Sequence, residues 1–171
     1  MAFVPEDGTG LAEANSYCAV AFADSYFADR GNALWAAATT GNKEVALIKA
    51  TDYIEGRFGD RFVGDKATTE QALQWPRINS DFASDVIPTN LKKATAEYAV
   101  RALSAVLAPD LAVDASGVIT HATRKKVGPI ETEFAKVTTG LGSSVMLFKP
   151  YPAADMLLKG LVVNVSGRVI R

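Results

Sequence analysis

The residues with the clearest chemical potential in this sequence form one short cationic run. Arg124, Lys125 and Lys126 are consecutive, and a Gly-Pro turn separates them from two acids, Glu131 and Glu133. Consecutive cations can neutralise nucleic-acid phosphates, so one interpretation is a DNA contact. Opposite charges on the two sides of a turn can also face each other across a β-hairpin, which stabilises the pair by about 0.2–1 kcal/mol. The sequence favours the charged hairpin, and the two interpretations are compatible.

Three further residues could contact DNA or a protein partner. Arg168 and Arg171 are two cations within the last four residues of the sequence. Trp75 precedes Pro76, and an indole beside a turn proline usually fills a gap in the core; its alternative role is a stacking platform for a base. The predicted partner or DNA contacts are Arg124, Lys125, Lys126, Arg168 and Arg171.

Catalytic and metal-binding residues are few. The chain has one cysteine, Cys18, and one histidine, His121, which is too few for an internal disulfide or a tetrahedral Cys/His zinc site. Cys18 is expected to be a small buried residue rather than a catalytic thiol, and His121 a surface or strand residue rather than a general base. The sequence contains no nucleophile elbow, phosphate-binding loop or dinucleotide fingerprint. We therefore expect a protein that is not an enzyme and uses no cofactor or metal.

Composition narrows the function classes further. A chain of 171 residues with 49% hydrophobic and 22% charged residues has the balance of one globular domain. Its net charge of −1 argues against a surface that attracts phosphates everywhere, so any DNA contact would be local. The hydrophobic runs are shorter than a membrane span, and the N-terminus lacks the pattern of an export signal. We expect synthesis in the cytosol without export.

The elements that must position these residues are mainly helices. Apolar residues spaced by three or four positions, with capping residues and prolines at the ends, predict helices over 20–30, 33–38, 42–58, 69–75, 89–108 and 152–159. Asn42 is the expected cap of the third helix, and a Thr68–Gln71 capping box is expected to start the fourth. The alanine-rich helix 89–108 should pack on more than one neighbour. Alternating residues then predict two strands within 118–138, joined near Gly128.

The predicted fold is mainly α. It is a compact bundle of about four to five helices with a small β-hairpin and extended N- and C-terminal arms. We expect a single domain, 1–171, made of an arm (1–16), the helical bundle (17–109), the hairpin (118–138) and a C-terminal segment with its tail (140–171). The alternating tail needs the edge of a partner strand, from this chain or from another.

Several stretches of the sequence resemble one known phage family. They are PEDGTGLAEANSY, VAFADSYFADRGNALW, ALIKATDYIEGRF, QALQWPR, KKVGPIETEFA and YPAADMLLKGLV. In this order, and over nearly the whole chain, they are similar to the family labelled DnaT-like single-stranded DNA-binding protein, which occurs among the head and neck genes of tailed phages and their prophages. The sequence departs from the family at Ala19, where relatives tend to carry a hydroxyl residue that caps the first helix.

The resemblance implies two different functions. The gene setting resembles that of head–tail connector or head-completion proteins, mostly helical subunits that form a ring beneath the portal. It implies a structural virion protein, an adaptor ring of twelve copies at the head–tail interface, present in the host cytoplasm before assembly. Its expected partners are the portal protein, a tail-side neck or tail-terminator protein, further copies of itself and the packaged DNA passing through the channel.

In the adaptor interpretation, the segment from Leu161 to Arg171 docks on the portal or on a neighbouring subunit, and the run Arg124–Lys126 faces acids of another subunit. The family label implies the alternative, a single-stranded DNA-binding replication protein that uses Arg124, Lys125, Lys126 and Trp75. The near-neutral charge favours the adaptor, because a strand-binding protein usually gathers many cations.

Overall fold

The computed structural model describes residues 2–109, 124–127, 130–133 and 149–163. The chain divides into two units, one made of Met1–Leu107 with Pro150–Arg171, and the other of Ala108–Lys149. All five α-helices found in the described ranges belong to the first unit, and the second contains an antiparallel hairpin. The prediction of a mainly helical fold with a small β-hairpin is therefore confirmed.

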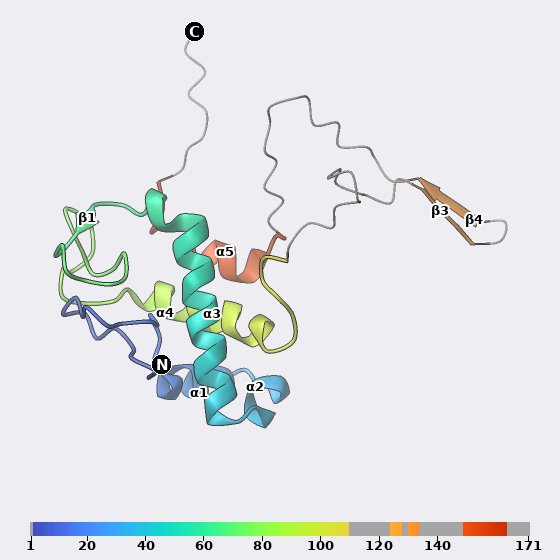
Figure 1. Cartoon of the computed structure of the whole chain (residues 1–171), viewed down its shortest axis with the longest axis horizontal. Coiled ribbons are helices and arrows are strands. Elements are labelled where there is room, and N and C mark those ends of the chain that lie inside the picture. The colour runs from blue at the N-terminus through green and yellow to red at the C-terminus, as the bar shows by residue number, and fades with distance from the viewer. Residues whose placement is uncertain (1, 110–123, 128–129, 134–148, 164–171) are drawn as a thin grey trace, which may run out of the picture. The chain divides into compact units, whose positions relative to one another are not determined.

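The helices of the first unit surround one long central helix. They are α1 (Val20–Ala28), α2 (Ala33–Ala37), α3 (Thr40–Phe58), α4 (Thr89–Ala102) and α5 (Pro152–Leu158). In Figure 1, α3 runs the length of this unit, with α1 and α2 at its N-terminal end and α4 and α5 beside it. Within the described ranges, none of these helices combines the length and the apolar content that a membrane crossing requires.

The core is built on the alanine-rich face of α4, as the sequence predicts. Its buried residues are Leu91, Ala94, Thr95, Ala96, Tyr98, Ala99 and Val100. Alanines let a neighbouring helix approach closely, and α4 indeed contacts α1, α3 and α5. Through this broad buried face, α4 packs against three other helices, α1, α3 and α5.

Several predicted helix ends differ from the structure. α1 ends at Ala28, α2 at Ala37 and α5 at Leu158, one or two residues before the predicted ends. The N-cap of α3 is Thr39 and not the predicted Asn42. The Thr39 hydroxyl accepts a hydrogen bond from the Asn42 N–H at 3.3 Å, so α3 begins at Thr40. α4 ends at Ala102 and does not continue to 108. Helix ends are the least certain part of a sequence prediction, because several nearby residues can cap a helix equally well.

The predicted helix over 69–75 is wrong, although its capping box forms. The Gln71 N–H donates to the Thr68 hydroxyl at 3.2 Å, and the Thr68 N–H donates to Gln71 Oε1 at 2.9 Å. The Gln71 amide then donates to the Leu73 and Pro76 carbonyls, at 2.8 and 3.0 Å. These contacts hold an irregular loop between the short paired strands β1 (Asp65–Lys66) and β2 (Arg77–Ile78).

The N-terminal segment is irregular, as predicted, but it is packed within the first unit and does not extend from it as an arm. The Glu6 side chain is 4% exposed and accepts hydrogen bonds from the N–H groups of Gly8, Gly10 and Leu11 at 2.9–3.0 Å. Gly8 has a φ of +112°, and a Cβ there would lie 2.0 Å from the Asp85 carbonyl oxygen. Only glycine fits this position, because the chain passes directly against the Asp85 backbone.

The last described residues of the chain pair with the segment that follows α3. Phe62 and Val162 form an antiparallel bridge, and the Val63 N–H donates to the Leu161 carbonyl at 3.0 Å. Leu161 is 1% exposed. The expected docking segment, Leu161 to Arg171, therefore starts too early, because residues 161–163 are already used within their own chain.

The first helix lacks a side-chain cap. Ala19 occupies the N-cap position of α1 with φ −72° and ψ 149°, and no side chain accepts from the first turn. This backbone conformation is the one that capping serines adopt.

We expect Ala19→Ser to raise the free energy of unfolding by about 1 kcal/mol, because its hydroxyl can accept from a free N–H of the first turn. Urea denaturation of both proteins measures the change. Ala21→Ser, at an exposed position inside α1, is the matched control and should not stabilise the fold. Equal effects of the two substitutions would contradict the capping explanation.

Candidate functional site

The cationic run lies on a β-hairpin, as the sequence predicts. It occupies β3 (Arg124–Val127), which pairs antiparallel with β4 (Ile130–Glu133). The register opposes Arg124 to Glu133 and Lys126 to Glu131, while Lys125 opposes Thr132. The predicted pairing of two cations with two acids across the strands is confirmed. The rest of the predicted hairpin, 118–138, and His121 lie outside the described residues.

The two terminal cations lie outside the described residues. Arg168 and Arg171 lie beyond Val163, the last described residue. The structure therefore brings together three of the five predicted contact residues, the consecutive cations of β3.

Trp75 does not offer a surface on which a base could stack. Its side chain is fully buried, and its ring packs nearly perpendicular to Phe62 and Phe82, with centroids 6.0 and 5.6 Å away. The stacking role is therefore wrong, and the expected role as a core residue is confirmed. Its indole Nε1 is the one buried side-chain nitrogen or oxygen in the described part of the chain that has no hydrogen-bond partner.

A cluster of hydrogen-bonded side chains around Asp155 lies in the first unit, near the two positions where the chain connects to the second unit. The Asp155 carboxylate accepts two hydrogen bonds from Arg57, at 3.0 and 3.3 Å, one from the Tyr98 hydroxyl and one from the Tyr151 N–H. The Tyr151 hydroxyl donates to the Leu107 carbonyl at 3.1 Å. Leu107 and Tyr151 flank the second unit in the sequence, so this cluster joins its two points of attachment.

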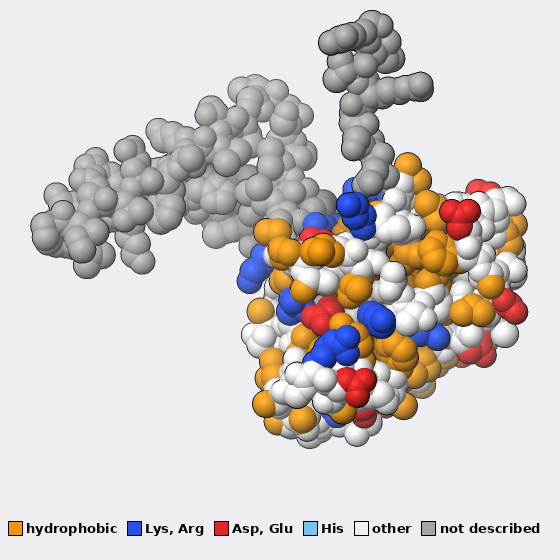
Figure 2. Space-filling model, turned by 180° about the vertical axis from the view of Figure 1, so that it is seen from behind, with side chains coloured by type: hydrophobic (Ala, Val, Ile, Leu, Met, Phe, Trp, Pro, Cys, Tyr) orange, Lys and Arg blue, Asp and Glu red, His pale blue; other side chains and the backbone are white. Residues whose placement is uncertain are grey.

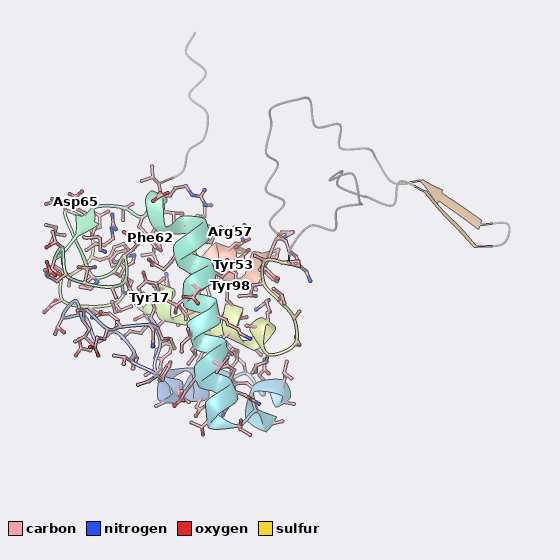
Figure 3. The ribbon with its side chains drawn as sticks, viewed as in Figure 1. Tyr17, Tyr53, Arg57, Phe62, Asp65 and Tyr98 are labelled. Carbon is pink, nitrogen blue, oxygen red and sulfur yellow. The ribbon has the colours of Figure 1, made fainter. Side chains whose placement is uncertain are left out.

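Aromatic packing supports the Asp155 cluster. The rings of Tyr53, Tyr98 and Tyr151 have centroids 5.0–5.9 Å apart, and Figure 3 shows Tyr53, Arg57 and Tyr98 together beside α3. Burial, reinforced by the Asp155 carboxylate, raises the pKa of Tyr98 well above its ordinary value, so its hydroxyl stays protonated as a donor. This cluster was not predicted from the sequence. The one sequence cue was an acid in the first turn of α5, where the helix dipole favours negative charge.

The first unit is not a basic surface. The described residues of the first unit contain 11 Lys and Arg and 15 Asp and Glu, a formal charge of −4. On the face shown in Figure 2, Lys and Arg side chains lie among Asp and Glu side chains and apolar ones. On this face, the acids interrupt the cations that could contact a phosphate backbone.

Two ionisable groups of the first unit, Cys18 and Glu55, have raised pKa values. Burial raises the pKa of the Cys18 thiol to about 12, so Cys18 is an unreactive core residue, as predicted. Burial also raises the pKa of Glu55, despite hydrogen bonds from Tyr17 and Gln74 that favour its ionised form. No group of three or more His, Cys, Asp or Glu residues that could hold a metal ion occurs in the part of the chain that the structure describes.

The raised pKa of Glu55 predicts a pH effect on stability. A carboxyl whose pKa is higher in the folded state favours folding below the unfolded pKa, near 4.5, and this contribution is lost as the pH rises through the folded value. We therefore expect Glu55→Gln to gain stability relative to the wild type between pH 5 and pH 7. Urea unfolding across this range tests it, with Glu13→Gln at an exposed position as the control. A constant difference between Glu55→Gln and the wild type would contradict the burial argument.

Comparison with known proteins gives one match. The model of a family described as "Putative DnaT-like ssDNA binding protein" matches residues 1–171. The chain belongs to this family. Neither the curated proteins nor the solved structures contain a significant match. Membership covers the full sequence and agrees with the resemblance noted above, and the family description names single-stranded DNA binding as its function.

Proposed function

We propose that this member of the family is a non-enzymatic assembly protein, an adaptor subunit of a ring in the neck of a tailed phage. The observation that carries the proposal is the register of β3 and β4, which opposes two of the three cations to acids. A hairpin in which acids lie opposite the cations suits contacts with other proteins better than contacts with phosphates, because a phosphate must compete with those acids. The excess of acids in the first unit supports the same conclusion.

The phage setting of the proposal comes from the sequence resemblance. The ring has twelve copies and lies at the head–tail interface, between the portal and a tail-side neck or tail-terminator protein, after assembly from the host cytoplasm. Packaged DNA passes through its channel, and the subunit needs no cofactor. Since residues 161–163 pair within their own chain, the segment available to a partner is 164–171.

Co-expression with the portal protein from the same phage genome tests the adaptor. We expect the two proteins to co-purify as a complex with a ring visible by electron microscopy. A chain that ends at Val163 should keep its thermal stability and lose the complex. A well-behaved portal that never binds the full chain would contradict the proposal.

Single-stranded DNA binding is the second candidate, and the family description favours it. The structure adds one observation in its support, because Arg124, Lys125 and Lys126 share one strand and Lys125 has the neutral Thr132 opposite it. Replacing the three cations by Glu should then abolish strand binding measured by fluorescence anisotropy. Binding that survives the three replacements would show that this surface is not the one that holds DNA.

A further inference from the structure

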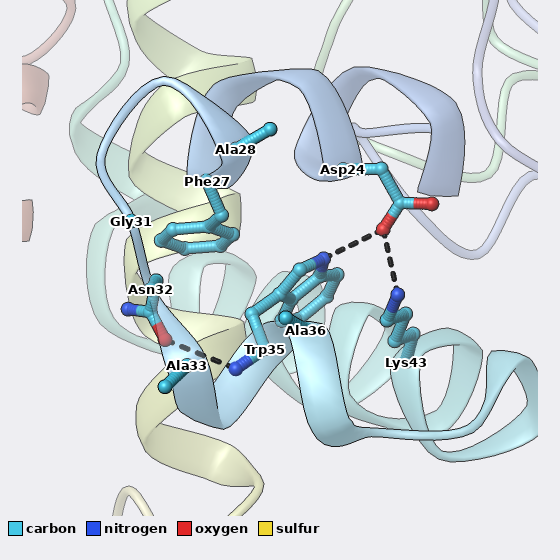
Figure 4. Close-up of a pocket in the computed structure, with 9 residues that line it drawn as sticks. All are labelled: Asp24, Phe27, Ala28, Gly31, Asn32, Ala33, Trp35, Ala36 and Lys43. Atoms are coloured by element: carbon cyan, nitrogen blue, oxygen red, sulfur yellow. Dashed lines mark hydrogen bonds and ion pairs between the residues drawn. The ribbon is translucent and has the colours of Figure 1, made fainter.

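A pocket of about 450 Å³ opens at the N-terminal end of α3. Figure 4 shows that α1, α2 and the turn between them form it, with Lys43 of α3 at one side. Trp35 and Phe27 are 1% and 2% exposed and pack against each other with centroids 5.0 Å apart. The other lining residues include small ones, Ala28, Gly31, Ala33 and Ala36. The pocket thus combines aromatic rings with short side chains, which leaves room for aliphatic groups.

One acid gives this pocket a polar side. Asp24 Oδ1 accepts hydrogen bonds from Trp35 Nε1 at 2.7 Å and from Lys43 Nζ at 2.9 Å. The side chain is 46% exposed, and Oδ2 accepts no hydrogen bond from the residues that the structure describes. Burial alone would raise the pKa of Asp24, but the bonds from Lys43 and Trp35 outweigh it and lower the pKa. Asp24 therefore stays ionised and can accept a guanidinium through Oδ2.

We propose that this pocket binds the tail of a second copy of the chain, residues 164–171. The tail sequence, NVSGRVIR, contains three aliphatic residues, two arginines and no acid. Its aliphatic side chains match the aromatic and alanine lining, and its arginines match the free oxygen of Asp24. This inference rests on the proposed ring and names the contact between neighbouring subunits.

The position of Val163, the residue before the tail, explains why the tail in the pocket comes from another copy. The Val163 N–H donates to the Arg61 carbonyl at 2.7 Å, directly after the C-terminal end of α3, whereas Lys43 lines the pocket near the N-terminal end. At 1.5 Å per residue, these two positions are roughly 27 Å apart along the helix. Val169 and Ile170 are six and seven residues after Val163, and a fully extended chain of that length spans at most about 22–25 Å. These two side chains therefore fall short of the pocket of their own chain.

A contact between one end of a subunit and the opposite end of the next is heterologous. Contacts of this kind repeat from copy to copy and close into a ring when the rotation between subunits allows it. The tail and the pocket are therefore the two different surfaces that a head-to-tail ring contact requires. Both lie outside the hairpin.

A labelled peptide of residues 163–171, titrated with the full chain at concentrations where sedimentation shows no self-association, tests the pocket. We expect saturable binding by fluorescence anisotropy. Ala36→Leu should weaken it by about tenfold or more, because the longer side chain fills the pocket, a change of about 1.4 kcal/mol in binding. Ala37→Leu, at an exposed position of α2 that does not line the pocket, should change it less than about twofold.

A second measurement leaves the pocket unaltered. A peptide carrying Arg168→Glu and Arg171→Glu should bind the unmodified chain at least about tenfold more weakly. Absence of binding by the original peptide, or equal binding by Ala36→Leu and Ala37→Leu, would overturn the inference. If the full chain still forms a ring with the portal in that case, the tail docks elsewhere and only the pocket inference fails. If no ring forms, the proposed function fails independently of the peptide.

Discussion

Arg77→Ala should lower the free energy of unfolding by about 4 kcal/mol, which is a large fraction of the stability of a single domain. Arg77 is 7% exposed. Its guanidinium donates to the backbone carbonyls of Phe62, Val63, Gly64 and Gln74, and also to Gln74 Oε1. Without it, one buried and several partly buried carbonyl groups lose their donor, and the loss costs up to about 1–3 kcal/mol for each fully buried group.

Chemical denaturation measures this effect. Lys49→Ala, which removes an exposed cation from α3, is the control and should change stability by less than about 0.5 kcal/mol. Arg77→Lys should recover only part of the loss, because one ammonium group cannot reproduce the fork of a guanidinium. A loss below about 1 kcal/mol for Arg77→Ala would show that water replaces the guanidinium as the donor.

Asp155→Ala should cost about 3 kcal/mol, because it removes a partly buried ion pair together with the acceptor of Tyr98 and of the Tyr151 N–H. Asp155 and Arg57 have side chains that are 26% and 17% exposed, so solvent screens the pair only in part. The effect should concentrate on α5 and on the residues that follow it.

Hydrogen exchange gives the sharper measurement for Asp155→Ala. The amides of α5 should exchange faster in the variant, while those in the centre of α3 keep their protection until global unfolding. Asp60→Ala, at an exposed position after α3, is the matched control and should leave both sets unchanged. A uniform loss of protection over all helices would contradict a local role of the Asp155 cluster in holding α5.

The sequence predicts the helices well because their stabilising contacts repeat along the chain. The spacing of apolar residues in α3 and the alanine-rich face of α4 follow a period that any buried helix must have, so both were found. The hairpin followed from local patterning in the same way, since a turn between alternating stretches fixes which cation opposes which acid.

The features that the sequence did not reveal depend on contacts between distant residues. The Thr68–Gln71 capping box formed as expected, but the helix after it did not, because Gln71 bonds to carbonyls of the following loop. In the sequence, Arg77 has the features of an ordinary surface cation. In the structure, it donates hydrogen bonds to the carbonyls of residues 62–64. Asp155 meets Arg57 and Tyr98 across separations of 98 and 57 residues, which no local pattern encodes.

In the candidate site too, features set by neighbouring residues were predictable from the sequence, and features set by distant residues were not. The acids opposite Arg124 and Lys126 were predictable from four residues on either side of a turn. The pocket beside Trp35 was not, because it needs α1, α2 and the first turns of α3 to come together. The burial of Trp75 was the favoured interpretation, but it took the positions of Phe62 and Phe82 to exclude the stacking role.

The most direct test of the central claim is a titration of a labelled single-stranded oligonucleotide with the purified full chain, followed by fluorescence anisotropy at low and moderate salt. A charge-compensated assembly protein should show no binding well into the micromolar range and no systematic dependence on salt. Tight binding that weakens steeply as salt increases would contradict the account, because it would show that the cations of β3 are available to phosphates despite the acids opposite them.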